Sequence, residues 1–144
     1  MKEVDNYLSK IGFVARRLLG SRSLLILIGR DGLANASIVK GIAKGLKRRV
    51  KSKVVLIKEP FLPAINSEKW ESLADSFDTI LLFGRGPQGG SSLILTLEAR
   101  SRGAFAIQVL PIEKKKDPGC DFAIMTGLPG VFPDVIGKID QLTK

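Results

Sequence analysis

Histidine is absent from this sequence of 144 residues, and cysteine occurs once, as Cys120. Histidine is the most common general base and metal ligand near neutral pH, so its absence excludes a Ser-His-Asp triad formed within the chain. A single cysteine excludes an internal disulfide and a cysteine-clustered metal site. We therefore expect no metal and no cofactor, and we cannot assign a catalytic residue from the sequence.

Long apolar runs and aromatic residues are also scarce. No run reaches the roughly 18–20 residues that a membrane-spanning helix needs, and the charged segment 1–5 does not resemble a signal peptide. We expect a cytoplasmic protein with no membrane contact. Because aromatic residues make up only 6% of the chain, the core must consist mainly of Leu, Ile, Val and Ala, with Trp70 and Phe77 packed among them.

Positive charge is in excess, because 23 Lys and Arg residues face 14 Asp and Glu residues and give a net charge of +9. Such an excess favours polyanions or anionic small molecules as partners. Part of it lies in the basic stretch from Lys44 to Lys53, which is suited to nucleic-acid phosphates. The stretch has no aromatic residues for base stacking, and a solvated helix end explains it more simply. Nucleic acid therefore remains an open but not favoured partner.

Short apolar runs alternate with segments of helical periodicity along the whole chain. The expected strands are 24–28, 54–57, 78–83, 104–110 and 122–125, and the expected helices are 3–19, 35–48, 68–76, 91–102 and 132–142. This alternation predicts a three-layer α/β/α fold with a doubly wound, five-stranded parallel sheet in the order 2-1-3-4-5. We expect a single Rossmann-like domain over residues 1–144, with an N-terminal helix.

A first glycine-rich loop follows the first expected strand. Glycines let a backbone turn sharply and approach a ligand, and the helix after the loop presents free N–H groups to an anion. An ordinary turn with a capped helix explains the same residues equally well. The candidate ligand-binding residues of this loop are Gly29, Arg30, Gly32, Asn35 and Ser37.

A second loop, after the third expected strand, is richer in glycine and matches the pattern G-x-G-x-x-G. The strand that follows its helix ends in Leu110 and Pro111, so the carboxylate that binds ribose in dinucleotide-binding proteins is missing there. Here a ligand-binding role is favoured over a structural one. The candidate residues are Gly84, Arg85, Gly86, Gln88, Gly89, Ser91 and Ser92.

Two glutamates are candidate general bases for an aldose–ketose isomerase, which needs a carboxylate or a histidine near the sugar. Glu59 follows the second expected strand, and Glu98 lies in the helix after the second loop. A solvated or helix-bonded glutamate is the simpler interpretation of each.

The layout resembles the SIS (sugar isomerase) phosphosugar-binding domain family. The resemblance rests on the leading helix, on the loops after strands one and three, and on the segments 78–91, 98–104 and 107–109. The family's S-x-S-G-x-T motif is replaced here by the glycine run. The resemblance implies a sugar phosphate as the anionic ligand, with an isomerase or sensor role, and a homo-oligomer.

Two other functional classes remain open. One is a nucleotide- or dinucleotide-binding Rossmann-like protein that uses the same end of the sheet. The other is a non-catalytic basic interaction module.

Overall fold

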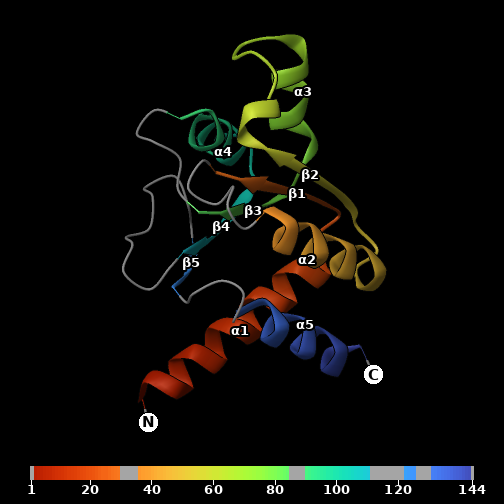
Figure 1. Cartoon of the computed structure of the whole chain (residues 1–144), viewed down its shortest axis with the longest axis vertical. Coiled ribbons are helices and arrows are strands. Elements are labelled where there is room, and N and C mark those ends of the chain that lie inside the picture. Colours follow the sequence, from red (N-terminus) through yellow and green to blue (C-terminus); the bar gives the residue numbers. More distant parts are fainter. Residues whose placement is uncertain (1, 30–35, 85–89, 111–121, 126–130, 144) are drawn as a thin grey trace.

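One parallel sheet forms the centre of the molecule in the computed structural model, which describes residues 2–29, 36–84, 90–110, 122–125 and 131–143 (Figure 1). All neighbouring strands pair in parallel, in the order β2-β1-β3-β4-β5. The strands are β1 (Ser23–Ile28), β2 (Lys53–Lys58), β3 (Thr79–Phe83), β4 (Phe105–Leu110) and β5 (Phe122–Met125).

The two central strands owe their composition to burial on both faces. Every residue from Leu24 to Ile28 in β1 and from Ile80 to Phe83 in β3 is fully buried. Strands covered on both faces need apolar side chains at successive positions, so their sequences do not alternate between polar and apolar residues. Continuous apolar runs therefore predicted both strands correctly.

Helices cover both faces of this sheet (Figure 1). One hydrophobic cluster joins alternate strand residues to α1, α2 and α5, and a second joins the other residues to α3 and α4. The predicted α/β class and the order of the four longer strands, β2-β1-β3-β4, are confirmed. The helices are α1 (Lys2–Gly20), α2 (Ala36–Arg49), α3 (Glu68–Ser76), α4 (Ser91–Ser101) and α5 (Val131–Leu142), with a short 3-10 turn, η2, at Glu59–Phe61.

The apolar stripe of α1 packs within the chain. Ile11, Val14, Ala15 and Leu18 are buried in the first cluster, so these side chains do not supply an exposed contact. The expected homo-oligomer remains a prediction. Among the described helices, none is both long and apolar enough to cross a membrane.

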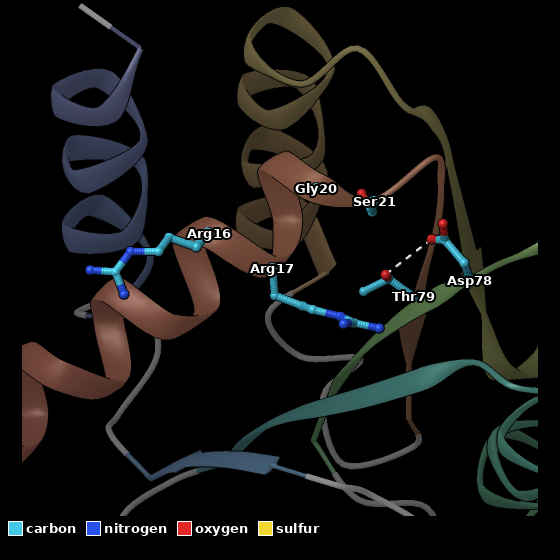
Figure 2. A pocket seen from close by; sticks show the side chains of 6 residues that line it. All are labelled: Arg16, Arg17, Gly20, Ser21, Asp78 and Thr79. Atoms are coloured by element: carbon cyan, nitrogen blue, oxygen red, sulfur yellow. Dashed lines mark hydrogen bonds between the residues drawn. The ribbon is translucent and has the colours of Figure 1, made fainter.

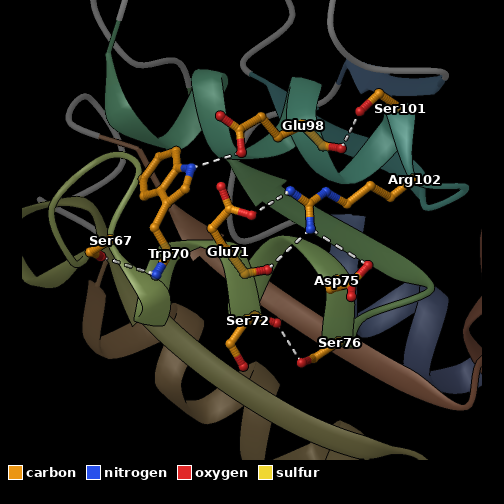
Figure 3. A network of polar contacts seen from close by, with 9 residues as sticks. All are labelled: Ser67, Trp70, Glu71, Ser72, Asp75, Ser76, Glu98, Ser101 and Arg102. Carbon is orange, nitrogen blue, oxygen red and sulfur yellow. Dashed lines mark hydrogen bonds and ion pairs between the residues drawn. The ribbon is translucent and has the colours of Figure 1, made fainter.

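Polar contacts join α3 to α4 on the second face (Figure 3). The indole Nε1 of the fully buried Trp70 donates to Glu98 Oε2 at 2.9 Å. One turn beyond Glu98, at the end of α4, the Arg102 guanidinium lies 3.1 Å from Oε2 of Glu71, the neighbour of Trp70 in α3. Ser67 caps α3 by accepting a hydrogen bond from the backbone N–H of Trp70. The expected packing of Trp70 and Phe77 in the core is confirmed.

The end of α4 requires a glycine at position 103. The N–H of Gly103 donates to the carbonyl of Arg100, and the N–H of Ala104 donates to the carbonyl of Ala99. These two bonds form a Schellman motif, in which the residue after the cap adopts a left-handed conformation. Gly103 has a φ of 102°, which disfavours any residue with a Cβ atom.

Two glycine-to-alanine substitutions are therefore expected to change stability in opposite directions. A Cβ atom meets nothing within 4 Å at Gly103 or at Gly41, which lies on the exposed side of α2. Gly103→Ala should lower the free energy of unfolding by about 1–2 kcal/mol because of backbone strain. Gly41→Ala should raise it by about 0.5–1 kcal/mol because alanine favours the helix. Urea denaturation measures both, and equal signs would contradict the assigned φ of Gly103.

Candidate site at the carboxyl edge of the sheet

Three strands end side by side at the carboxyl edge of the sheet. Ile28 of β1 is paired with Lys58 of β2 on one side and with Phe83 of β3 on the other. The next strand along the chain, β2, lies on one side of β1, and β3 lies on the other side. The strand order therefore reverses at β1. Open parallel sheets bind their ligands at such a switch point.

Gly29 and Gly84 open the two glycine-rich loops at this point. The N–H of Gly29 donates to the carbonyl of Phe83 at 2.9 Å, and the N–H of Gly84 donates to the carbonyl of Val109 at 3.0 Å. Gly84 has a φ of 83°, so its position demands glycine. The two loops therefore start next to each other, as the predicted strand order requires.

Most of the other predicted ligand residues fall outside the part of the chain that the structure describes, so their roles stay predictions. These are Arg30, Gly32, Asn35, Arg85, Gly86, Gln88 and Gly89. Ser37 is exposed in the first turn of α2, and Ser91 is half-buried at the start of α4. Ser92 is completely buried.

The carboxylate of Glu59 lies at the same edge, directly after β2 as predicted, but its burial was not predicted. Glu59 directly follows β2 and is 8% exposed. Its Oε1 accepts a hydrogen bond from the backbone N–H of Ser92 at 3.1 Å and another from Ser92 Oγ at 2.9 Å. Since β1 lies between β2 and β3 in the sheet, this contact crosses the carboxyl end of β1. The interpretation of Glu59 as a solvated side chain is wrong, whereas the helix-bonded interpretation is confirmed.

Glu59 acts as a remote cap for α4. Gly90, the N-cap residue, has no side chain to accept a bond from the first turn. A carboxylate at this end of a helix also interacts favourably with the positive end of the helix dipole. The predicted use of Ser92 as a ligand donor remains untested, but in this structure both of its donor groups are directed at Glu59.

The second oxygen of the same carboxylate, Oε2, is buried without a hydrogen-bond partner. An unpaired buried acceptor costs about 1–3 kcal/mol. Such a cost persists in native proteins where the group serves another purpose, and each case therefore calls for an explanation. A donor supplied by a ligand would remove the cost.

Two lysines add positive charge to this edge on the opposite face of the sheet. Residues 54 and 56 of β2 pack against the cluster of α1, α2 and α5, and Lys58 shares that face because strand side chains alternate. Lys58 lies beside Lys40 of α2, whose positive charge lowers the pKa of Lys58. Like charges held this close favour a negatively charged partner.

The second candidate base, Glu98, has a structural role. Its carboxylate accepts the Trp70 indole N–H between α3 and α4. The helix-bonded interpretation of Glu98 is therefore confirmed.

A hollow at the opposite, amino-terminal edge of the sheet is also structural (Figure 2). It has a volume of about 190 Å³ and lies between the end of α1 and the start of β3. Its carboxylate, Asp78, accepts a bond from the backbone N–H of Arg22 at 2.8 Å, and Thr79 Oγ1 also donates to it. The Arg17 guanidinium lies over the Phe105 ring, 4.5 Å from its centroid. These groups satisfy one another and position the start of the strands.

A shallow groove of about 450 Å³ lies between α3 and the segment that begins at Phe61. Phe61, which is 76% exposed, borders it together with Pro63 and residues of α3: Lys69, Ser72 and Leu73. Phe61 follows Glu59 by two residues, so their Cα atoms lie within about 7 Å of each other. In the described ranges, no three His, Cys, Asp or Glu side chains gather into a metal site.

Comparison with known proteins shows the fold but no family. No family model and no curated protein matches the sequence. The structure of Sir2Af2 bound to a myristoylated histone peptide matches 94% of this chain and 98% of its own, with a TM-score of 0.61 and 13% identity. A second structure, of a Sir2 enzyme, matches 93% of this chain and 99% of its own, with a TM-score of 0.60 and 14% identity.

The third similar structure is named "Putative sugar binding protein from Salmonella typhimurium LT2". It matches 93% of this chain and 40% of its own, with a TM-score of 0.60 and 18% identity. At identities this low, the likeness to all three structures defines a Rossmann-like α/β fold and nothing finer.

Proposed function

We propose that this chain binds a nucleotide or dinucleotide at the carboxyl edge of β1 and β3, with Glu59 accepting a hydrogen bond from a ribose hydroxyl. The observation that carries the proposal is the buried, unpartnered Oε2 of Glu59, which follows β2 at the carboxyl edge of the sheet. In dinucleotide-binding folds, a carboxylate about 20 residues beyond the first glycine loop binds the ribose in this way. Glu59 has the corresponding place, directly after β2.

The rest of a nucleotide finds suitable chemistry around this carboxylate. Phosphate groups suit the backbone N–H groups of the loops that begin at Gly29 and Gly84. The exposed ring of Phe61 and the groove beside it offer a stacking surface for the base. Likeness to Sir2 enzymes supports the same choice over the other open classes at the level of the fold.

A phosphosugar is the second candidate ligand, favoured by the structural likeness to the Salmonella protein with sugar binding in its name. A sugar phosphate also combines an anion with hydroxyl donors, so Glu59 and the glycine loops suit it too. It lacks a base, however, and leaves the groove beside Phe61 without a role. The SIS-like interpretation therefore remains the alternative.

Calorimetric titration distinguishes the two ligands. The probes are NAD, ADP, 2′-deoxy-ADP, 3′-deoxy-ADP, fructose 6-phosphate and inorganic phosphate. We expect ADP or NAD to bind, and one deoxy analogue to bind about 10- to 100-fold more weakly, the value of a hydrogen bond to a charged group. Glu59→Gln should weaken ADP binding by a similar factor and leave the affinity for that deoxy analogue unchanged.

Glu98→Gln is the matched control, because it changes the other glutamate that is bonded to a neighbouring helix. It should leave ADP affinity unchanged. Binding of fructose 6-phosphate without nucleotide binding would establish the phosphosugar alternative. If Glu59→Gln lowered the affinities for ADP and for the weaker deoxy analogue by the same factor, the carboxylate would not contact the ribose.

A further inference from the structure

A row of cations runs along the exposed side of α2. Four helix residues share this side, because each is separated from the next by about one helical turn or less, and a fifth cation follows just beyond the end of the helix. The opposite side of α2 is buried against the sheet through Val39, Ile42, Ala43 and Leu46. All five cations are exposed: Lys40, Lys44, Lys47, Arg48 and Lys51. We call them the α2 row.

The cations of the α2 row have no acidic partner among the residues that the structure describes. No acidic residue occurs in α2, and within the described ranges none of the five cations forms an ion pair. Their neighbour Arg49 differs, since its guanidinium lies 2.9 Å from the Asp140 carboxylate of α5. A helix surface selected only for solubility normally mixes both signs, because like charges four residues apart destabilise a helix.

Several acidic side chains of the molecule are paired with other cations. On the same face of the sheet, the Asp140 carboxylate of α5 binds Arg49, and on the opposite face the α3 carboxylates of Glu71 and Asp75 bind Arg102. The α2 row is therefore a local concentration of positive charge, and such a concentration attracts a polyanion.

The geometry of the α2 row fits a regular chain of phosphates. From Lys40 to Arg48 the helical part of the row extends about 12 Å at 1.5 Å per residue, and Lys51 follows beyond the end of α2. A DNA strand carries one phosphate per 3.4 Å of helix axis, so about three to four phosphates lie along the helical part of the row. A membrane-bound helix inserts an apolar side into the lipid, but the apolar side of α2 is already buried. The row has no aromatic side chain to stack on bases.

We propose that the α2 row is a nucleic-acid interface that binds the phosphate backbone without reading base sequence. This proposal is independent of the nucleotide site, because Lys44, Lys47 and Lys51 lie along α2 away from the edge where Lys58 meets Lys40. Affinity from this interface comes from released counterions and must fall steeply with salt.

Fluorescence anisotropy with a labelled 20-base-pair duplex, between 50 and 200 mM NaCl, tests the proposal. Five contacts predict a slope of about −4.5 for log K against log salt, or a loss of roughly 500-fold in affinity over this range. Lys44→Ala/Lys47→Ala should reduce the slope to about −2.7 and the loss to roughly 40-fold. Its affinity for ADP should equal that of the unaltered protein.

The control variant is Arg16→Ala/Lys69→Ala, which removes the same charge from exposed positions on α1 and α3. It should keep the original slope. An equal reduction in the control would show that net charge, and not the α2 row, binds DNA, and would overturn the proposal. Absence of DNA binding at 50 mM salt would also overturn it. The same holds if Lys44→Ala/Lys47→Ala weakens binding to vesicles of phosphatidylcholine and phosphatidylserine but does not weaken binding to DNA.

Discussion

Trp70→Ala is expected to lower the free energy of unfolding by about 3–5 kcal/mol, the usual cost of removing a buried indole. Trp70 is fully buried in the cluster between the sheet and α3 and α4, and it is the largest side chain there. The substitution also leaves Glu98 without its indole partner. Urea denaturation followed by circular dichroism measures the change.

Two further variants make this result interpretable. Phe61→Ala removes an aromatic ring that is 76% exposed and should change stability by no more than about 0.5 kcal/mol. Trp70→Phe keeps most of the packing and loses the hydrogen bond, so its loss of free energy of unfolding should lie between those of Phe61→Ala and Trp70→Ala. It remains measurable even if Trp70→Ala does not fold. A cost below 1 kcal/mol, on the order of an average surface change, would contradict the burial of Trp70.

Glu59→Ala is expected to destabilise the protein by about 1–3 kcal/mol, because the Ser92 N–H and hydroxyl lose their shared acceptor in a buried environment. Ser92→Ala removes only the hydroxyl and should cost about 1 kcal/mol. Chemical denaturation of both single variants and the double variant gives the coupling between the two residues.

The double variant is the decisive measurement for this contact. Residues that share a buried hydrogen bond show a coupling energy of about 0.5–3 kcal/mol in such a cycle. Additive effects would mean that Glu59 does not cap α4 in solution. Glu59→Gln retains an acceptor for Ser92 and should be the mildest substitution at this position.

The sequence predicts the strands and helices well where burial determines composition. The apolar run of β1 and the Ser67 cap of α3 are local signals, and the structure confirms both. Pro60 and Pro63 predict irregular backbone after β2, and the structure has the 3-10 turn of Glu59–Phe61 there.

The role of Glu59 depends on a contact 33 residues away in the chain, which no local pattern reveals. A signal was nevertheless present. The strand that follows the helix after the second loop ends in Leu110 and Pro111, with no carboxylate. The strand that follows the helix after the first loop is followed directly by Glu59, where dinucleotide-binding folds carry the carboxylate that binds ribose.

The edge position of β2 has a consequence for self-association. An edge strand exposes unpaired backbone groups that invite a second strand to add to the sheet. Lys53 and Lys58 stand at the two ends of β2. Antiparallel addition of a second β2 in matching register would place Lys53 of one copy opposite Lys58 of the other, and like charges in such positions repel. The two lysines thus act as gatekeepers against edge-to-edge aggregation, and any oligomer of this chain should form through another surface.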